Sequence, residues 1–184
     1  IATILGTMIA FAIGRHRFRG RSTTNLLIFL PMATPEVVLG ASLLALFLNM
    51  RINPGFWTIV IAHVMFCISF VVVTVKARIA SLDPRLEQAA MDLYANERET
   101  FRYVTLPLVA PGIFGAALLS FSLSFDDFII TNFNSGIVTT FPKFVYVSSA
   151  RGIPAQANVI GSSMFFIALI IVIIGQVISK QRKR

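Results

Sequence analysis

Long apolar runs constrain this chain more than any other feature of its sequence. Five of them cover residues 1–14, 26–48, 56–75, 109–131 and 157–178. Each of the last four is about 20 residues or longer, which is the length that an α-helix needs to cross the hydrocarbon core of a bilayer. Strands of a membrane β-barrel are about half as long and alternate in polarity, a pattern that these runs lack. The sequence therefore predicts an all-α bundle of transmembrane helices.

The charge content of the chain agrees with a membrane environment. Only 13% of its 184 residues are charged, about half the share that a soluble domain carries. The net charge of +8 comes from short basic clusters that separate the apolar runs, so it favours lipid over nucleic acid as the partner. The single cysteine, Cys67, lies inside an apolar run, which excludes a disulfide framework and predicts a small core residue. Neither a metal cluster nor a cofactor site is predicted.

The distribution of basic residues predicts an orientation. Thirteen of the 16 Lys and Arg residues lie in residues 15–25, in residues 76–108 or in the tail from Lys180, and three lie in the alternate loops. The positive-inside rule places the first group in the cytoplasm. The run 1–14 then crosses from outside to inside, although at 1.5 Å per residue it covers only about 21 Å. We therefore expect a preceding segment in the intact protein, with six spans where five are present.

Residues 76–108 form a charged loop with an amphipathic pattern. Asp83-Pro84 is a helix-start signal. The apolar residues Leu86, Ala89, Ala90 and Leu93 then recur at i, i+3, i+4 and i+7. A second short segment runs from Glu97 to Val104, and Leu106-Pro107 is expected to break the chain. Such a hairpin suits docking on another protein, whereas an ordinary solvated loop fits the periodicity equally well.

The run Leu86 to Ile113 resembles the EAA loop of bacterial ABC importer permeases. Ala89-Ala90 supply its two alanines, and Leu106-Pro107 close the pattern at the right spacing after Val104. Gln88 replaces the Glu of the family pattern, and we expect Glu87 to carry part of the missing charge.

The second departure from the family pattern is Tyr94, which takes the place of a Gly. A Gly there allows a turn with positive φ, which a bulky residue resists. We therefore expect Ala95-Asn96 to supply the turn instead.

This resemblance implies that the loop is a coupling helix seated in a groove of an ATPase subunit. The candidate coupling residues are Leu86, Glu87, Ala89, Ala90, Asp92, Leu93, Tyr94, Leu106 and Pro107. Further stretches, Leu30 to Glu36, Ser122 to Asp127 and Phe141-Pro142 followed by Tyr146, look like the second membrane subunit of the spermidine/putrescine permeases. The resemblance implies one transmembrane permease domain over residues 1–184. The implied partners are a homologous permease, cytoplasmic ATPase subunits and an external binding protein, at the bacterial cytoplasmic membrane.

Three acids inside or at the rim of apolar runs are candidates for a substrate pathway: Glu36, Asp126 and Asp127. An ionised carboxylate at the bilayer centre costs at least about 2.5 kcal/mol, so such residues face a cavity or a partner. Adjacent helix residues point about 100° apart, so we expect one aspartate to face the pathway and the other to bind backbone or a neighbouring span. A polyamine site combines carboxylates with aromatic faces, and Phe125 is an aromatic candidate for it, although a lipid-facing or core position of the phenylalanines stays open. Pro31 and Pro35 are expected to interrupt the helix before Glu36 and to free backbone carbonyls, and broken helices at membrane depth often line a cavity. A structural role for the aspartates and a plain rim position for Glu36 stay open.

Other functions stay open at this stage. The substrate of such a permease could be an iron complex, thiamine or a phosphonate; an anion would require Lys or Arg in the spans, which carry acids instead. A channel or secondary transporter that needs no ATPase is a further alternative. The sequence contains no G-x-x-x-x-G-K-[ST] phosphate loop, so ATP hydrolysis is expected in a partner. His63, alone in an apolar run, is expected to form an interhelical hydrogen bond.

Overall fold

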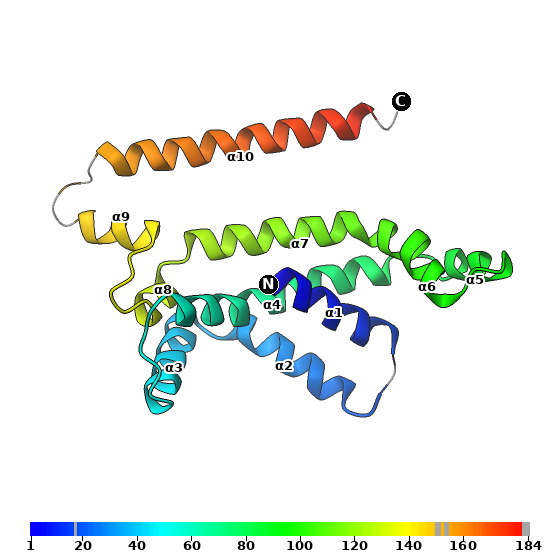
Figure 1. Cartoon of the computed structure of the whole chain (residues 1–184), viewed down its shortest axis with the longest axis horizontal. Coiled ribbons are helices and arrows are strands. Elements are labelled where there is room, and N and C mark those ends of the chain that lie inside the picture. Colours follow the sequence, from blue (N-terminus) through cyan, green and yellow to red (C-terminus); the bar gives the residue numbers. More distant parts are fainter. Residues whose placement is uncertain (17, 150–151, 153–154, 182–184) are drawn as a thin grey trace. The chain divides into compact units, whose positions relative to one another are not determined.

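The computed structural model describes residues 1–16, 18–149, 152 and 155–181, without the side chains of 171, 172 and 174–181. Its helices are α1 (Ala2–Arg15), α2 (Arg21–Ala33), α3 (Glu36–Asn49), α4 (Phe56–Ala80), α5 (Arg85–Asp92), α6 (Glu97–Thr100), a π-helix (Phe101–Thr105), α7 (Leu106–Asp126), α8 (Ile129–Asn134), α9 (Phe141–Ser149) and α10 (Ala155–Gln181) (Figure 1). No strand occurs in these described ranges, so the all-α prediction is confirmed for them. The chain divides into two units, residues 1–138 and 139–184.

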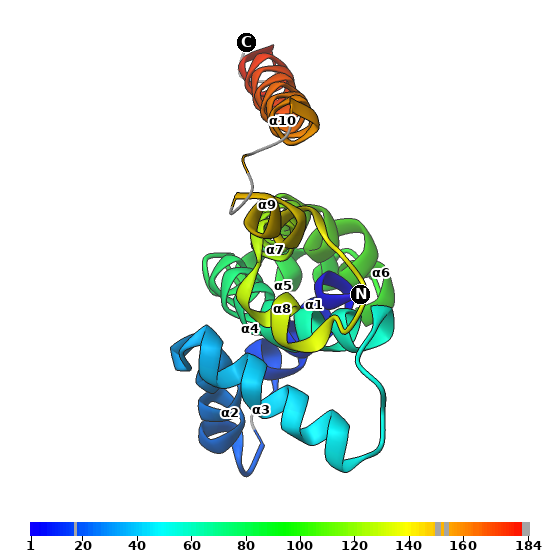
Figure 2. The ribbon, with the colours of Figure 1, turned by 90° about the vertical axis from the view of Figure 1, so that its left-hand side faces the viewer.

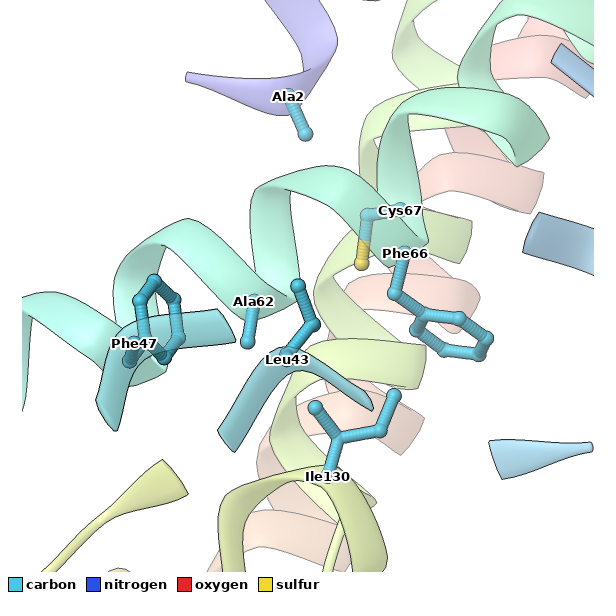
Figure 3. Close-up of a cluster of buried hydrophobic side chains, with 7 residues drawn as sticks. All are labelled: Ala2, Leu43, Phe47, Ala62, Phe66, Cys67 and Ile130. Carbon is cyan, nitrogen blue, oxygen red and sulfur yellow. The ribbon is translucent and has the colours of Figure 1, made fainter. Parts of the chain in front are cut away.

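Helix α4 is the centre of the first unit. It contacts α1, α2, α3, α7 and α8, and Figure 2 shows α1 and α7 gathered around it. Its first half joins one apolar cluster, which consists of Ala2, Leu43, Phe47, Ala62, Phe66, Cys67 and Ile130 (Figure 3). Its second half joins another, made of Ala10, Val71, Val72, Val75, Val109 and Ala116. Cys67 is 1% exposed, which confirms it as a core residue.

Small residues bring α1 close to α4. Ala2, Gly6 and Ala10 recur every four residues on the buried face of α1. A Cβ added at Gly6 would lie 2.6 Å from Cγ1 of Val71. Small residues at this spacing let two helices approach closely, which is a common means of packing helices in membranes.

The predicted single spans 26–48 and 109–131 are each broken. The first divides into α2 and α3, which meet at an angle of 106°. Pro35 lacks an N–H to continue the helix, and the Thr34 hydroxyl donates to the Leu30 carbonyl at 2.7 Å at the bend. The second run leaves the helical conformation at Asp127, which is extended, before α8 begins. Pro31, by contrast, is accommodated inside α2.

The predicted count of five spans is not confirmed. Among the described residues, α4 and the continuous helix Glu97–Asp126 are long and apolar enough to cross a membrane, and α2 with α3 makes a third if the bent pair is one span. The run 1–14 corresponds to α1, a shorter apolar helix, and the run 157–178 falls in α10, whose apolar part in the described residues, Ala155–Ile170, is also shorter.

The loop predicted over residues 76–108 is shorter than expected. The run 56–75 continues as α4 to Ala80, so Lys76 and Arg78 lie on a helix, and Arg78 donates to the Leu108 carbonyl at 2.8 and 3.0 Å. Leu106-Pro107 does not break the chain. The Leu106 N–H bonds to the Phe101 carbonyl in the wider π-helical register, so the missing N–H of Pro107 falls where the register changes.

Two contacts show which loops share an end of the first unit. Arg15, at the end of α1, forms an ion pair with Glu87, which brings the end of α1 and the loop after α4 together. Gly136, at φ 54°, lies so close to the Pro54 carbonyl that a Cβ would come within 2.4 Å of it. This alternation agrees with the charge pattern. That the basic loops are cytoplasmic stays a prediction. Arg17, Arg151 and residues 182–184, which belong to the charge pattern, lie outside the described residues.

The orientation is tested with single cysteines in a Cys67→Ala background. Ser22 and Ile137 are both exposed, Ile137 at 98%, so neither cysteine is shielded by the chain itself. We expect an impermeant thiol reagent added to intact cells to label Ile137→Cys, and to label Ser22→Cys only after the membrane is opened. Labelling of Ser22→Cys alone in intact cells would invert the topology.

Candidate functional site

Residues 81–105, which we call the docking hairpin, consist of the short helix α5, a turn, and α6 with the π-helix, which continue into α7 as one long helix. At the start of α5, a carboxylate oxygen of Asp83 accepts the Arg85 N–H at 2.9 Å. The helix begins at Arg85, one residue after the predicted start at Pro84. At α6, Asn96 and Glu99 exchange two side chain to backbone hydrogen bonds, each of 2.9 Å. This reciprocal capping box satisfies two otherwise unpaired N–H groups.

The turn between the two helices of the hairpin is made by Tyr94. Its φ is 65°, its N–H bonds to the Met91 carbonyl, and the next N–H, of Ala95, bonds to the Ala90 carbonyl. These two bonds define a Schellman motif, whose left-handed position is usually a Gly. The expectation that Ala95-Asn96 would supply the turn is therefore wrong, because Tyr94 itself adopts the left-handed conformation.

The predicted apolar stripe does not form a single face. Helix α5 ends at Asp92, so Leu93 lies in the turn and not on the helix. Ala89 is exposed, whereas Ala90 is half-buried. Three exposed apolar side chains lie at the end of the hairpin, Met91 at 47%, Leu93 at 82% and Tyr94 at 98%, whereas Leu86 and Tyr103 are exposed elsewhere on it. We call these three residues the hairpin tip.

Among the remaining coupling candidates, Asp92 lies between two residues of the hairpin tip, and the others lie apart from it. Asp92 is exposed at the end of α5, and Leu86 is partly exposed beside a small cavity at the end of α4. Leu106 and Pro107 are exposed in the first turn of α7. Glu87 points into the chain, towards Arg15 and Thr105.

The two neighbouring aspartates have different surroundings. Asp127 is buried, and its carboxylate accepts the N–H groups of Ile130 at 3.2 Å and Thr131 at 2.8 Å. It also lies 3.3 Å from Nε2 of His63. Asp126 is exposed at the last position of α7, and no hydrogen bond or ion pair to it is found in the part of the chain that the structure describes. Asp127 thus binds backbone and a neighbouring helix, as expected for one member of the pair.

His63 links three helices. Its Nδ1 lies 2.7 Å from the Ser124 hydroxyl on α7, and its Nε2 lies 2.8 Å from the Thr131 hydroxyl on α8. The predicted interhelical hydrogen bond is confirmed. Ser124 and Thr131 were not predicted to take part, because both are more than 60 positions away from His63 and carry no local signal. His63 and Ser124 also line an open cavity of about 360 Å³ between α1, α4 and α7.

The other pathway candidates occupy helix ends and an aromatic pair. Glu36 is exposed in the first turn of α3, immediately after the bend. Phe125 stacks on Phe121 with ring centroids 5.8 Å apart. No group of three or more metal-ligating side chains occurs within the described ranges.

Comparison with known proteins finds similarity over nearly the whole chain. Residues 2–181 match the family described as binding-protein-dependent transport system inner membrane component. The spermidine/putrescine transport system permease protein PotC of Haemophilus influenzae is 36% identical over 182 residues, covering 98% of this chain and 71% of that protein. PotC of Escherichia coli is 35% identical over 184 residues, covering 100% and 70%. The putrescine transport system permease protein PotI of Escherichia coli is 38% identical over 169 residues, covering 88% and 60%.

The left-handed conformation of Tyr94 predicts a measurable strain. A side chain in this region costs about 1–2 kcal/mol, so we expect Tyr94→Gly to slow hydrogen exchange of the Ala95 N–H, which closes the turn, by about fivefold. Tyr94→Val, whose branched Cβ fits the region less well, should accelerate it. Equal exchange in all three proteins would show that the turn is not strained.

Proposed function

Because the chain belongs to the family of binding-protein-dependent transport system inner membrane components, we propose that it is the permease subunit of an ATP-binding-cassette importer for polyamines. Members of this family are transport components and not enzymes, so a separate subunit hydrolyses ATP. The proposed complex contains this chain, a homologous permease, two cytoplasmic ATPase subunits and an external binding protein, assembled in the bacterial cytoplasmic membrane.

The hairpin tip supports the proposed contact with the ATPase. Three exposed apolar residues meet at one turn, where the chain holds a tyrosine in a conformation that costs free energy. Strain of this kind is retained most often at functional sites. In the proposed cycle, ATP-driven approach of the two ATPases moves the docking hairpins together, and the permeases change from an inward-open to an outward-open state.

Leu93 tests the ATPase contact. Its side chain is 82% exposed, so Leu93→Asp disturbs the free chain little and would place an unpaired charge in an apolar groove of the ATPase. We expect at least a tenfold loss of ATPase bound to the purified permease, equal to about 1.4 kcal/mol.

Leu93→Met is the matched control, because it keeps an apolar side chain of similar volume. It should bind the ATPase like the parent. Equal binding by Leu93→Asp and the parent would exclude the hairpin tip from the contact.

The exposed position of Asp126 at the C-terminal end of α7 supports a cationic substrate. At 1.5 Å per residue, the 21 residues of α7 extend about 31 Å, so Asp126 and Leu106 lie about one bilayer core apart. The C-terminal end of a helix carries a partial negative charge, which repels a carboxylate. A bound ammonium group would relieve this repulsion, and each charged hydrogen bond would contribute about 1.5–3 kcal/mol.

The acids of this unit also weigh against the alternative substrates. An anionic solute such as a phosphonate would be repelled by Asp126, and no basic residue lies in α7 itself. An iron complex or thiamine stays a weaker alternative, because the relatives reported above are named for spermidine and putrescine. A channel or secondary transporter needs no docking hairpin.

The two aspartates form a matched pair for testing the substrate. Asp126→Asn should lower spermidine and putrescine uptake by the reconstituted complex at least tenfold, equal to about 1.4 kcal/mol, while the complex stays assembled. Asp126→Glu, which keeps the charge, should retain most of the uptake.

Asp127→Asn should instead lower the free energy of unfolding by about 1–3 kcal/mol, because it weakens the cap of α8 and the contact with His63. Normal uptake in Asp126→Asn would mean that this carboxylate does not bind the substrate.

A further inference from the structure

Three side chains from three separate elements meet at the base of the docking hairpin. Arg15 is the last residue of α1, Glu87 lies in the first turn of α5, and Thr105 is the last residue of the π-helix. The Thr105 hydroxyl donates to Oε1 of Glu87 at 2.6 Å, and the Arg15 guanidinium lies 3.0 Å from the same hydroxyl. Arg15 also donates to that Glu87 oxygen. Each member therefore contacts the other two.

From this geometry we infer that Glu87 is a positioning residue, whose bonds to Arg15 and Thr105 make the docking hairpin move together with α1 and α7. This inference rests on the proposed function, because it assigns how a displacement produced by the ATPase reaches the spans. Glu87 would then act inside the permease, and not as a charge presented to the ATPase groove.

Electrostatics favour this cluster over a casual surface contact. Arg15 lies at the negative end of α1 and Glu87 near the positive end of α5, so each charge is stabilised by its own helix as well as by its partner. Both side chains are 31% exposed, whereas Thr105 is fully buried. A buried hydroxyl that accepts and donates within the cluster fixes its geometry, since it has no water to exchange with.

An aromatic contact joins the same elements beside the polar cluster. Phe11 on α1 meets Phe101 at the start of the π-helix with ring centroids 5.2 Å apart, and the Arg15 guanidinium lies 5.7 Å from the Phe11 ring. The contact between Phe11 and Phe101 holds α1 to the π-helix without α5, and the contact between Arg15 and Phe11 lies within α1. Helix α5 itself has no fully buried residue, so Glu87 supplies its fixed polar connection to the two elements that lead into the spans.

The π-helix gives this connection a mechanical consequence. Its i→i+5 bonds are less common than those of an α-helix, and single π-turns occur mostly at functional positions. Thr105 occupies the last position before α7 begins. A shift of α5 that pulls on Thr105 would therefore act at the point where the register changes.

The inference predicts a specific uncoupling in the reconstituted complex of permeases, ATPases and binding protein. Glu87→Gln should leave ATPase binding and ATP hydrolysis near the parent values, and lower the spermidine transported per ATP by about fivefold, the equivalent of roughly 1 kcal/mol. Thr105→Val, which removes only the hydroxyl, should act in the same direction. Thr105→Ser and Glu97→Gln, an exposed acid on α6, are the controls and should behave like the parent.

A second measurement tests, independently of transport, whether the bonds of Glu87 to Arg15 and Thr105 fix α5 to α1. Spin labels on Met8→Cys in α1 and Gln88→Cys in α5, both exposed positions, report the distance between the two helices in the purified chain with Cys67→Ala. The distance distribution should be narrow in the parent and in Thr105→Ser, and broader in Glu87→Gln and Thr105→Val. Equal distributions in all four would overturn the inference, whatever the transport assay gives.

Two outcomes separate this inference from the proposed function. If Glu87→Gln abolishes ATPase binding while Thr105→Val matches the parent, Glu87 contacts the ATPase. The inference that Glu87 is a positioning residue is then wrong, and the transporter assignment stands. If the parent itself shows no ATP-dependent uptake, the proposed function fails, and the spin-label distances still decide whether Glu87 fixes α5 to α1.

Discussion

The burial of α4 is the constraint on which the rest of the first unit depends. This helix is apolar along most of its length and has buried residues in both of its halves, so it contributes to both apolar clusters. Gly6 lets α1 approach α4 closely. Arg78, in the last turn of α4, donates to the Leu108 carbonyl on α7. Because helix packing in a membrane depends on close contact and on polar bonds between helices, these contacts set the positions of the elements that carry the candidate sites.

At two breaks between helices in this unit, a polar side chain forms hydrogen bonds with the backbone. At the bend between α2 and α3, the Thr34 hydroxyl adds a second hydrogen bond to the Leu30 carbonyl, which also accepts the Thr34 N–H. The Asp127 carboxylate binds two N–H groups at the start of α8. Unpaired backbone groups at membrane depth cost several kcal/mol, so irregular backbone persists there only when it is satisfied or lines a cavity. The breaks are therefore specific features of the fold.

The sequence predicted helix type, the apolar runs and the start of the docking hairpin, since these depend on local composition and spacing. Pro31 and Pro35 both predict an interrupted helix before Glu36: the break occurs at Pro35, whereas Pro31 lies inside α2. The angle of 106° was not predicted, because apolar composition does not specify the direction of a bend. The inward position of Glu87 depends on Arg15, 72 positions away. Tyr94 was misjudged because the geometry of the turn outweighs the preference of a single residue.

The three acids illustrate how one side-chain type acquires different roles from its position on a helix. Glu36 lies at the N-terminal end of α3 and Asp127 caps the start of α8, so the partial positive charge of a helix stabilises both. Asp126 lies at the C-terminal end of α7, where that charge is negative. The two positions are linked, because Asp127 reaches the α8 N–H groups only if the chain leaves α7 directly after Asp126. The break that satisfies Asp127 therefore also leaves Asp126 exposed at the end of α7 where its charge is least favourable.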